Sequence, residues 1–145
     1  MNIRPEPART PEKGFSLMEL MVVIAILGIL STIVVTNVIP MLKKGKVNAA
    51  KVSIGSLKSA VTNYQLNNNR LPESLQVLTQ PDPKNFNEVY IEDESSLIDP
   101  WGTPFELKLE GGNKFEIISY GGDGLPGGEP GSEEEDISSK GSSGN

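Results

Sequence analysis

The feature that most constrains this chain is an apolar run at residues 20–42, near the start of its 145 residues. Residues 20–35 carry no charge, and Ile, Val, Leu, Met and Ala side chains would cover a helix here on every side. About 20 such residues span the apolar core of a bilayer, and a helix without a polar face belongs in lipid or at the centre of an assembly. The run therefore predicts a helix whose packing partners lie outside its own domain.

The segment before this run, residues 1–14, indicates how the helix would be oriented. It carries more basic than acidic side chains, so this flank of the helix is weakly positive. Positive flanks stay on the cytoplasmic side of a membrane, which predicts a cytoplasmic N-terminus. No cleavage site of the small-x-small type follows the apolar run, and this disfavours an ordinary secretory signal peptide.

Glu19 places a carboxylate directly before the apolar run. A charge inside the apolar part of a bilayer is costly, and residues that carry that cost are functional candidates. The alternative is that Glu19 sits at the level of the lipid headgroups without a special role. Its location alone favours this alternative, whereas the residues around it favour a function.

Those surrounding residues, 14–20, read GFSLMEL and follow a lysine. The pattern resembles the class III signal of type IV pilins and of the pseudopilins of type II secretion systems. The resemblance implies that a membrane-bound prepilin peptidase cuts between Gly14 and Phe15 and methylates the new amine of Phe15. Glu19 would then pair with that amine during assembly, because a carboxylate in apolar surroundings needs a cationic partner. The plain alternative is a membrane anchor that is not processed.

Composition narrows the remaining function classes. The length allows one small domain beside the apolar helix. The net charge of −6 argues against nucleic acid as a partner. The chain has neither cysteine nor histidine, which excludes disulfides, zinc sites built on those ligands, and Ser-His or Cys-His catalysis. Metal sites with oxygen ligands remain open.

Periodicity predicts the elements that follow the apolar run. Apolar residues spaced three and four apart predict that the helix continues as an amphipathic helix with one stripe facing a domain: Val47, Ala50, Ile54, Leu57, Val61 and Tyr64. Alternating apolar and polar residues at 105–109 and an apolar-rich segment at 115–120 flank the turn Gly-Gly-Asn, which predicts a β-hairpin. These elements predict an α+β fold.

Two further motifs narrow the resemblance to the major pseudopilins of type II secretion: DPWGTPF at residues 99–105 and SYGGDGLPGG at residues 119–128. The implied fold is pilin-like, with a long N-terminal hydrophobic helix packed by its C-terminal half on a small antiparallel β-sheet with irregular loops. The implied organisation has a cleaved leader at 1–14, a transmembrane and filament-core segment at 15–42, a periplasmic domain at 43–137 and a disordered tail at 138–145.

The same resemblance implies a calcium ion that holds the C-terminal loop, where type IV pilins usually have a disulfide. Asp123 and Asp136 match the family's motif as calcium ligands. The interval between them is longer than in the family, so Glu134 and Glu135 remain competing candidates. Calcium takes carboxylate and carbonyl oxygens in flexible geometry, which an acidic, glycine-rich loop can supply. The alternative is an acidic run that is simply solvated.

We therefore expect a structural subunit, not an enzyme. In the favoured interpretation the chain polymerises into a periplasmic pseudopilus that helps drive folded exoproteins across the outer membrane. It would sit in the bacterial inner membrane as a single-pass protein with its C-terminal domain in the periplasm. The expected partners are other copies of the chain, minor pseudopilins, the prepilin peptidase, inner-membrane assembly platform proteins and the membrane, with no nucleic acid.

Two other functions are compatible with parts of the sequence. A type IV pilin of a surface fibre, serving adhesion, motility or DNA uptake, is the second candidate, but the absence of cysteine and the acidic glycine-rich loop count against it. An anchored enzyme using carboxylates is the third, and the sequence shows no paired arrangement that supports it.

Overall fold

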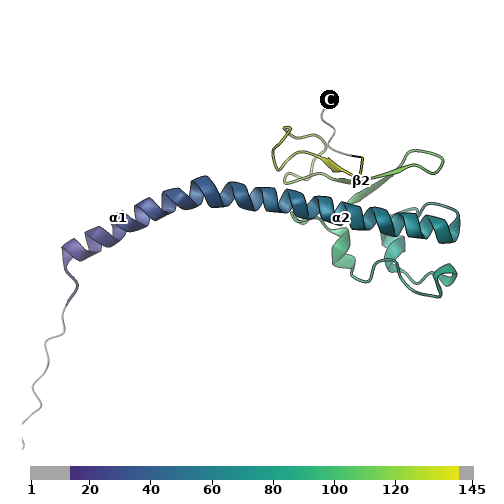
Figure 1. Cartoon of the computed structure of the whole chain (residues 1–145), viewed down its shortest axis with the longest axis horizontal. Helices are drawn as coiled ribbons and strands as arrows, with labels where there is room; N and C mark the ends of the chain where they lie inside the picture. Colours follow the sequence, from purple (N-terminus) through teal and green to yellow (C-terminus); the bar gives the residue numbers. More distant parts are fainter. Residues whose placement is uncertain (1–13, 141–145) are drawn as a thin grey trace, which may run out of the picture. The chain divides into compact units, whose positions relative to one another are not determined.

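The computed structural model of the chain describes residues 14–140. Helical structure runs without interruption from Leu17 to Asn68, as α1 (Leu17–Ile33), the π-helical turn η1 (Val34–Val38) and α2 (Ile39–Asn68) (Figure 1). The predicted apolar helix and its continuation are thus confirmed. The predicted leader lies outside the described residues, apart from Gly14.

The chain divides into two compact units, Met1–Ile39 and Pro40–Asn145. In the first unit, none of the α1 residues is buried. Its apolar side chains are exposed on every side of the helix, and Leu27, for example, is 55% exposed. By length and composition, the continuous helix Leu17–Asn68 is the one helix among the described residues that could cross a membrane. The first unit therefore has no core of its own within the described residues.

The π-helical turn η1 lies directly before Pro40. The Ile39 N–H donates to the Val34 carbonyl, five residues back rather than four. Proline lacks an N–H and crowds the carbonyl four residues before it, so an α-helix cannot pass through it undisturbed. The wider turn lies where that disturbance is expected.

The second unit builds its core against one side of α2. Five of the six predicted stripe residues are buried, and Val47 packs against the core while only partly buried. The buried residues of this helix are Ala50, Ile54, Leu57, Ala60, Val61 and Tyr64, of which Ala60 was not predicted. On the opposite side Val52 and Leu66 remain 71% and 72% exposed. Asn69 ends the helix with a positive φ of 54°, a conformation that asparagine tolerates. All buried apolar residues among those described lie from Ala50 to Ile137, so the core belongs entirely to the second unit.

A small antiparallel sheet covers this helix with strands β1 (Glu106–Leu109), β2 (Phe115–Ser119) and β3 (Ile137–Ser138), in that order. Glu106 pairs with Ile118 in the hairpin, and Ser119 pairs with Ile137 at the other edge of β2. Ile117 is fully buried and joins the core cluster of the helix. The predicted hairpin is confirmed, and β3 is an addition that the sequence did not predict.

The third strand corrects the predicted tail. Residues 138–145 were expected to be disordered, yet Ser138 pairs with Ile118 and the Ser139 N–H donates to the Ile117 carbonyl at 2.9 Å. The Lys140 ammonium also pairs with the Glu110 carboxylate. The physical reason is that an open sheet edge supplies backbone partners to a polar segment that could not bury itself. Residues 141–145 lie outside the described residues.

The chain between α2 and the sheet is irregular, with three short 3₁₀ helices: η2 (Leu75–Thr79), η3 (Pro83–Asn85) and η4 (Glu94–Leu97). Leu75, Leu78 and Leu97 from these turns are buried in the core.

Asp82 joins this irregular region to the end of α2. Its carboxylate accepts hydrogen bonds from the Tyr90 hydroxyl at 2.6 Å, the Asn68 amide at 2.5 Å and the Lys84 N–H at 2.9 Å. The Tyr90 hydrogen bond is the main reason why the pKa of Asp82 lies below its usual range, although burial opposes the shift. The carboxylate therefore acts in its charged form as a structural acceptor.

Candidate functional site

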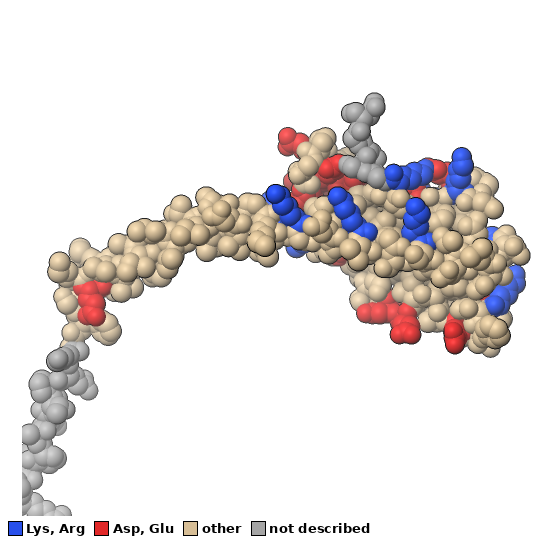
Figure 2. All heavy atoms as spheres, in the orientation of Figure 1, with Lys and Arg blue, Asp and Glu red and all other residues tan. Residues whose placement is uncertain are grey.

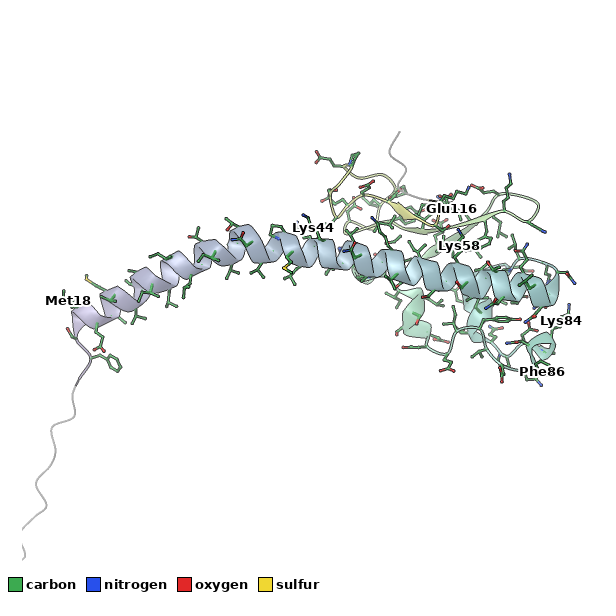
Figure 3. The ribbon with its side chains drawn as sticks, viewed as in Figure 1. Met18, Lys44, Lys58, Lys84, Phe86 and Glu116 are labelled. Atoms are coloured by element: carbon green, nitrogen blue, oxygen red, sulfur yellow. The ribbon has the colours of Figure 1, made fainter. Side chains whose placement is uncertain are left out.

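The predicted processing site lies in an extended segment at the start of α1. Gly14 to Ser16 are not helical, and the Phe15 side chain is 88% exposed. Ser16 caps the helix by accepting the Met18 N–H at 3.3 Å. The side chains along α1 project outward, beginning with Met18 (Figure 3). The segment is therefore open to another protein up to the first turn of the helix.

Glu19 lies in that first turn and is exposed. It forms no ion pair within residues 14–140. A carboxylate here is favoured by the partial positive charge of the helix N-terminus. Phe15 lies four residues before Glu19, in the extended segment that precedes the helix. An amine at Phe15, from the same or another copy, is the partner that the sequence analysis predicts for Glu19.

The C-terminal loop, residues 121–136, is built around glycines that leave no room for side chains. A Cβ at Gly128 would lie 1.9 Å from the Glu134 carbonyl oxygen, and one at Gly121 would lie 2.6 Å from the Glu133 carbonyl oxygen. Both glycines also have positive φ. The Gly122 N–H donates to the Glu133 carbonyl at 2.7 Å. The backbone of the acidic run thus passes close to Gly121 and Gly128, and only glycine permits that approach.

Asp136 is the predicted ligand with a distinctive environment. Its Oδ2 accepts the Gly127 N–H at 3.0 Å, and its own N–H donates to the Gly127 carbonyl at 3.1 Å. Its Oδ1 is buried and has no hydrogen-bond partner among the described residues. A buried carboxylate oxygen without a donor is unfavourable, so this atom is suited to a cation or a bound water.

The other predicted ligands differ from Asp136. Asp123 is exposed, and its Oδ1 accepts the Leu125 N–H at 3.0 Å. Glu134 is exposed, and the Oε2 of Glu135 accepts the Gly131 N–H at 2.6 Å. No three acidic side chains within residues 14–140 come together closely enough to hold a metal ion.

A calcium site in this loop would therefore need carbonyl oxygens beside one or two carboxylates. Calcium accepts such mixed ligand sets in flexible geometry. The unpartnered Asp136 oxygen is chemically suited to an ion of this kind, which makes Asp136 the best-placed of the predicted carboxylates.

Asp99 stabilises the start of the C-terminal loop through hydrogen bonds, a role that the sequence analysis did not predict. It is 5% exposed, and its Oδ1 accepts the N–H groups of Trp101 and Thr103 at 3.0 and 2.9 Å. Its Oδ2 accepts the Ser119 hydroxyl at 2.6 Å, and Ser119 in turn accepts the Gly121 N–H at 3.3 Å. An Asp that opens an Asp-Pro-x-Gly turn commonly accepts backbone N–H groups two residues on, and this was the available signal.

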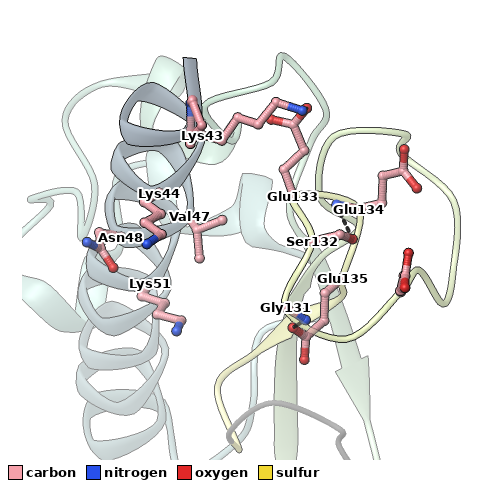
Figure 4. A pocket seen from close by; sticks show the side chains of 12 residues that line it. Lys43, Lys44, Val47, Asn48, Lys51, Gly131, Ser132, Glu133, Glu134 and Glu135 are labelled. Carbon is pink, nitrogen blue, oxygen red and sulfur yellow. Dashed lines mark hydrogen bonds and ion pairs between the residues drawn. The ribbon is translucent and has the colours of Figure 1, made fainter. Parts of the chain in front are cut away.

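The acidic run also contacts α2. Lys43 and Glu133 reach toward each other beside a groove of about 540 Å³ that is lined by α2 and the loop (Figure 4), and their charged atoms lie 2.9 Å apart. The Lys43 ammonium lowers the pKa of Glu133. Because the pair is partly exposed, we expect its contribution to stability to be small. No pattern in the sequence indicates that these distant residues meet.

Comparisons with known proteins agree with this architecture. Residues 37–140 match the family described as Type II secretion system (T2SS), protein G, and residues 9–35 match the Prokaryotic N-terminal methylation motif. The type II secretion system core protein G of Pectobacterium carotovorum subsp. carotovorum is 41% identical over 126 residues, which cover 80% of this chain and 80% of the relative. The protein of the same name from Pseudomonas aeruginosa is 37% identical over 131 residues, covering 83% and 90%.

A solved structure is also similar. The crystal structure of the major pseudopilin from the type 2 secretion system of enterohaemorrhagic Escherichia coli aligns with a TM-score of 0.54 at 29% identity. The alignment covers 71% of this chain and 93% of that one. The likeness confirms the predicted pilin-like α+β fold.

Proposed function

Since the chain belongs to the type II secretion system protein G family, we propose that it is the major subunit of a pseudopilus and acts by polymerising through its N-terminal helix. The family is one of structural pseudopilins, and the proposed role is structural rather than catalytic. The filament would stand in the periplasm and help drive folded exoproteins across the outer membrane.

The observation that carries this proposal is the exposure of the apolar side chains of α1 on every side of the helix. No α1 residue is buried, although the helix is almost entirely apolar. Exposed apolar area of this extent is unstable in water, where each buried aliphatic side chain is worth about 1.5–3 kcal/mol. Lipid and the α1 helices of other copies are the two environments that would cover it. A subunit that moves from membrane to filament exchanges one for the other.

The N-terminal residues would prepare the subunit for that exchange. Cleavage between Gly14 and Phe15 would remove the leader and free the Phe15 amine beside the apolar helix, and that amine would then be methylated. The match to the methylation motif at residues 9–35 supports this step. Glu19 would then pair with the Phe15 amine of its own or a neighbouring copy. An unpaired charge inside packed apolar helices is strongly unfavourable, so the pairing would set the axial position of each incoming copy.

Calcium would bind in the C-terminal loop and stabilise its folded conformation. The buried Oδ1 of Asp136 supports its role as a ligand, and Asp123 would add a second carboxylate. Glu134 and Glu135 remain competing candidates for that second position, because Asp123 is also exposed and already accepts the Leu125 N–H. The positive charge of the ion would stabilise carboxylate oxygens that accept no hydrogen bond. The residues of the loop orient those oxygens by their own backbone hydrogen bonds.

The proposed setting is the bacterial inner membrane, with the second unit in the periplasm. The expected partners there are the prepilin peptidase, minor pseudopilins and the inner-membrane assembly platform proteins. The candidate membrane helix Leu17–Asn68 is near the N-terminus, as this setting requires.

Deletion of the gene in its own bacterium, with secretion followed in the periplasm and the medium, tests the function. We expect exoproteins to accumulate folded in the periplasm and to reappear in the medium when the gene is restored. Sheared filaments from cells that overproduce the chain should contain a protein that begins at methylated Phe15. Normal secretion by the deletion strain, or a mature protein that begins elsewhere, would contradict the proposal.

A further inference from the structure

The groove between α2 and the C-terminal loop carries opposite charges on its two walls. It has a volume of about 540 Å³ and lies in the second unit, at the start of α2 (Figure 4). Lysines line it on the helix side and glutamates on the loop side: Lys43, Lys44, Lys51, Glu129, Glu133 and Glu134. A ligand in this groove would therefore meet ammonium groups on one side and carboxylates on the other.

Contacts within the chain use only part of this charge. Lys43 pairs with Glu133 at 2.9 Å, and Glu135, which also lines the groove, accepts the Gly131 N–H. The other four of the six side chains are exposed and form no ion pair within residues 14–140: Lys44, Lys51, Glu129 and Glu134. Two ammonium groups and two carboxylates thus remain available. A ligand that carries both charges matches them better than a simple anion or cation does.

The groove begins where the apolar run ends. Residues 20–42 carry no charge, and Pro40 already lines the groove. In Figure 2 the first basic side chains along the helix follow this uncharged stretch. Along the helix, Lys44 lies about 3 Å and Lys51 about 13 Å beyond Leu42. The headgroup layer on each side of a bilayer is about 5–7 Å thick. If residues 15–42 span the apolar core, Lys44 therefore lies within this layer, and Lys51 lies beyond it.

Lys51 can still reach the headgroup layer. Helical side chains lean toward the N-terminus of their helix, which here is the membrane end, and a lysine side chain is long. Lys44 should nevertheless make the stronger contact with a headgroup, because its backbone already lies at the right level.

The lysines also run against the usual distribution of charge around a membrane helix. Residues 43–51 contain four lysines and no acidic residue. Basic residues normally gather on the cytoplasmic side of a membrane, whereas the proposed setting places these residues in the periplasm. They therefore do not serve to orient the helix, and binding of a lipid phosphate is a role that their position allows.

We propose that this groove binds the headgroup of one phosphatidylethanolamine-type lipid while the chain is in the membrane. The lipid phosphate would lie against Lys44 and Lys51, and its ammonium group would donate to Glu129 and Glu134. A primary ammonium suits the acidic wall because it donates charge-assisted hydrogen bonds, which a quaternary ammonium lacks the hydrogens to form. The bound lipid would hold the second unit at the membrane surface. The inference goes beyond the proposed function, since it needs the membrane setting but no filament.

Nuclear magnetic resonance of the full-length chain tests the site, with one copy in each phosphatidylcholine nanodisc and calcium held constant. Asn48 and Ser132 line the groove from its two walls, so their amide signals report on it. We expect both signals to shift and to saturate as phosphatidylethanolamine replaces phosphatidylcholine. Phosphatidylglycerol should shift them less, because its headgroup has no cation for the acidic wall. The signal of Gly112, in the hairpin turn, should stay unchanged and is the control.

Neutral variants identify the two walls. Lys44→Gln and Glu129→Gln should each raise the lipid fraction needed for half of the shift by about tenfold, because each removes one charge-assisted hydrogen bond. Lys51→Gln should have a smaller effect. Lys114→Gln and Glu73→Gln make the same changes at exposed positions outside the groove and should leave the titration unchanged. All five positions are exposed, so unchanged melting temperatures should confirm that the variants fold.

Four results would overturn the inference. Equal responses to phosphatidylethanolamine and phosphatidylcholine, or a Lys44→Gln variant that titrates as Lys114→Gln does, would remove the site. A stronger response to phosphatidylglycerol would show that the lysines attract anionic lipid without the acidic wall. Equal shifts from soluble phosphoethanolamine at the same concentration would make the ligand a soluble phosphate ester. Shifts that follow the number of copies per nanodisc would make the occupant a second copy of the chain.

These results are independent of the proposed function. A chain that forms normal filaments but shows no lipid response would overturn this inference alone. A chain that binds the lipid but forms no filaments would overturn the proposed function alone.

Discussion

The two parts of the long helix use apolar residues in opposite ways. In α1 they lie on every side and none is buried, whereas in α2 they form one stripe that packs into the core. Leu27 in α1 is 55% exposed, and Leu57 in α2 is 2% exposed. The same residue type in the same secondary structure therefore has two different environments.

This difference shows where each helix obtains its stability. The packing of α2 is supplied by its own sheet and loops, through residues such as Val61 and Ile117. The packing of α1 must come from lipid or from other copies, because the described chain supplies none. A change in α2 should therefore alter the monomer, and a change in α1 should alter the assembly. The following predictions test this division, from the largest expected effect to the smallest.

The largest effect is expected from Glu19→Ala. The variant should still be inserted and cleaved, but filaments should be almost absent, because the Phe15 amine would then be left without its partner among apolar helices. Filament yield is measured after shearing, and the processed chain is quantified in membranes. Glu73→Ala, which removes an exposed carboxylate of the second unit, is the control. Normal filaments from Glu19→Ala would assign this carboxylate to the headgroup region.

A matched pair of leucine variants tests the division directly. Leu57→Ala should lower the free energy of unfolding of the second unit by about 2–5 kcal/mol, because it leaves a cavity in the core. Leu27→Ala should leave that quantity unchanged, since its side chain touches no core. Denaturant unfolding of the full chain in detergent, followed by the fluorescence of Trp101, gives both values. Equal effects of the two variants would mean that α1 and α2 share one core.

Calcium should stabilise the second unit without affecting α1. A ligand that binds only the folded state at about a hundredfold above its dissociation constant contributes about 2.7 kcal/mol. We expect the melting temperature to fall on chelation and to rise with added calcium. Asp136→Asn should remove most of this response, and Glu134→Gln should remove little of it.

Gly128→Ala offers a second route to the same loop. The added Cβ has no space beside Glu134, so the loop should lose its shape and its calcium response. Gly45→Ala is the control, because Gly45 lies in α2 with open space around it. If the melting temperature of the unmodified chain does not change with calcium, the acidic run binds no calcium and is only solvated.

The smallest effect concerns pH and Asp82. Its pKa is lower in the folded chain than in the unfolded chain, chiefly because Tyr90 donates to it. The folded state therefore binds fewer protons, so this contribution to stability is present above the unfolded pKa and is lost as the pH falls through the folded pKa. Tyr90→Phe should flatten the dependence of unfolding free energy on pH in the acidic range. An unchanged pH dependence in this variant would show that the Asp82 carboxylate does not contribute to the pH dependence of stability.

The helices were predictable because their signals are local. The spacing of residues from Val47 to Tyr64 fixes the buried face of α2 before any partner is known. The hairpin was predictable for the same reason, since alternation and a glycine turn lie within one short segment. Strand β3 was not predictable, because two residues contain no pattern and their pairing depends on the open edge of β2.

The residues of the candidate sites could be predicted from the sequence, but the contacts that those residues make could not. The motif around Gly14 and Glu19 is contiguous, so resemblance alone could assign it. The support that Asp99 gives to the loop, and the pairing of Lys43 with Glu133, both depend on long-range packing that the sequence does not encode locally. The buried Oδ1 of Asp136 distinguishes it from Glu134 and Glu135 only once the loop is folded.

The most direct test of the central claim is a structure of the sheared filament at side-chain resolution by electron cryomicroscopy. We predict that residues 15–42 of many copies pack against one another at the filament axis. The second units, with α2 against its sheet, should form the outer layer. A filament whose axis is formed by the second units, with α1 exposed on the outside, would contradict the account.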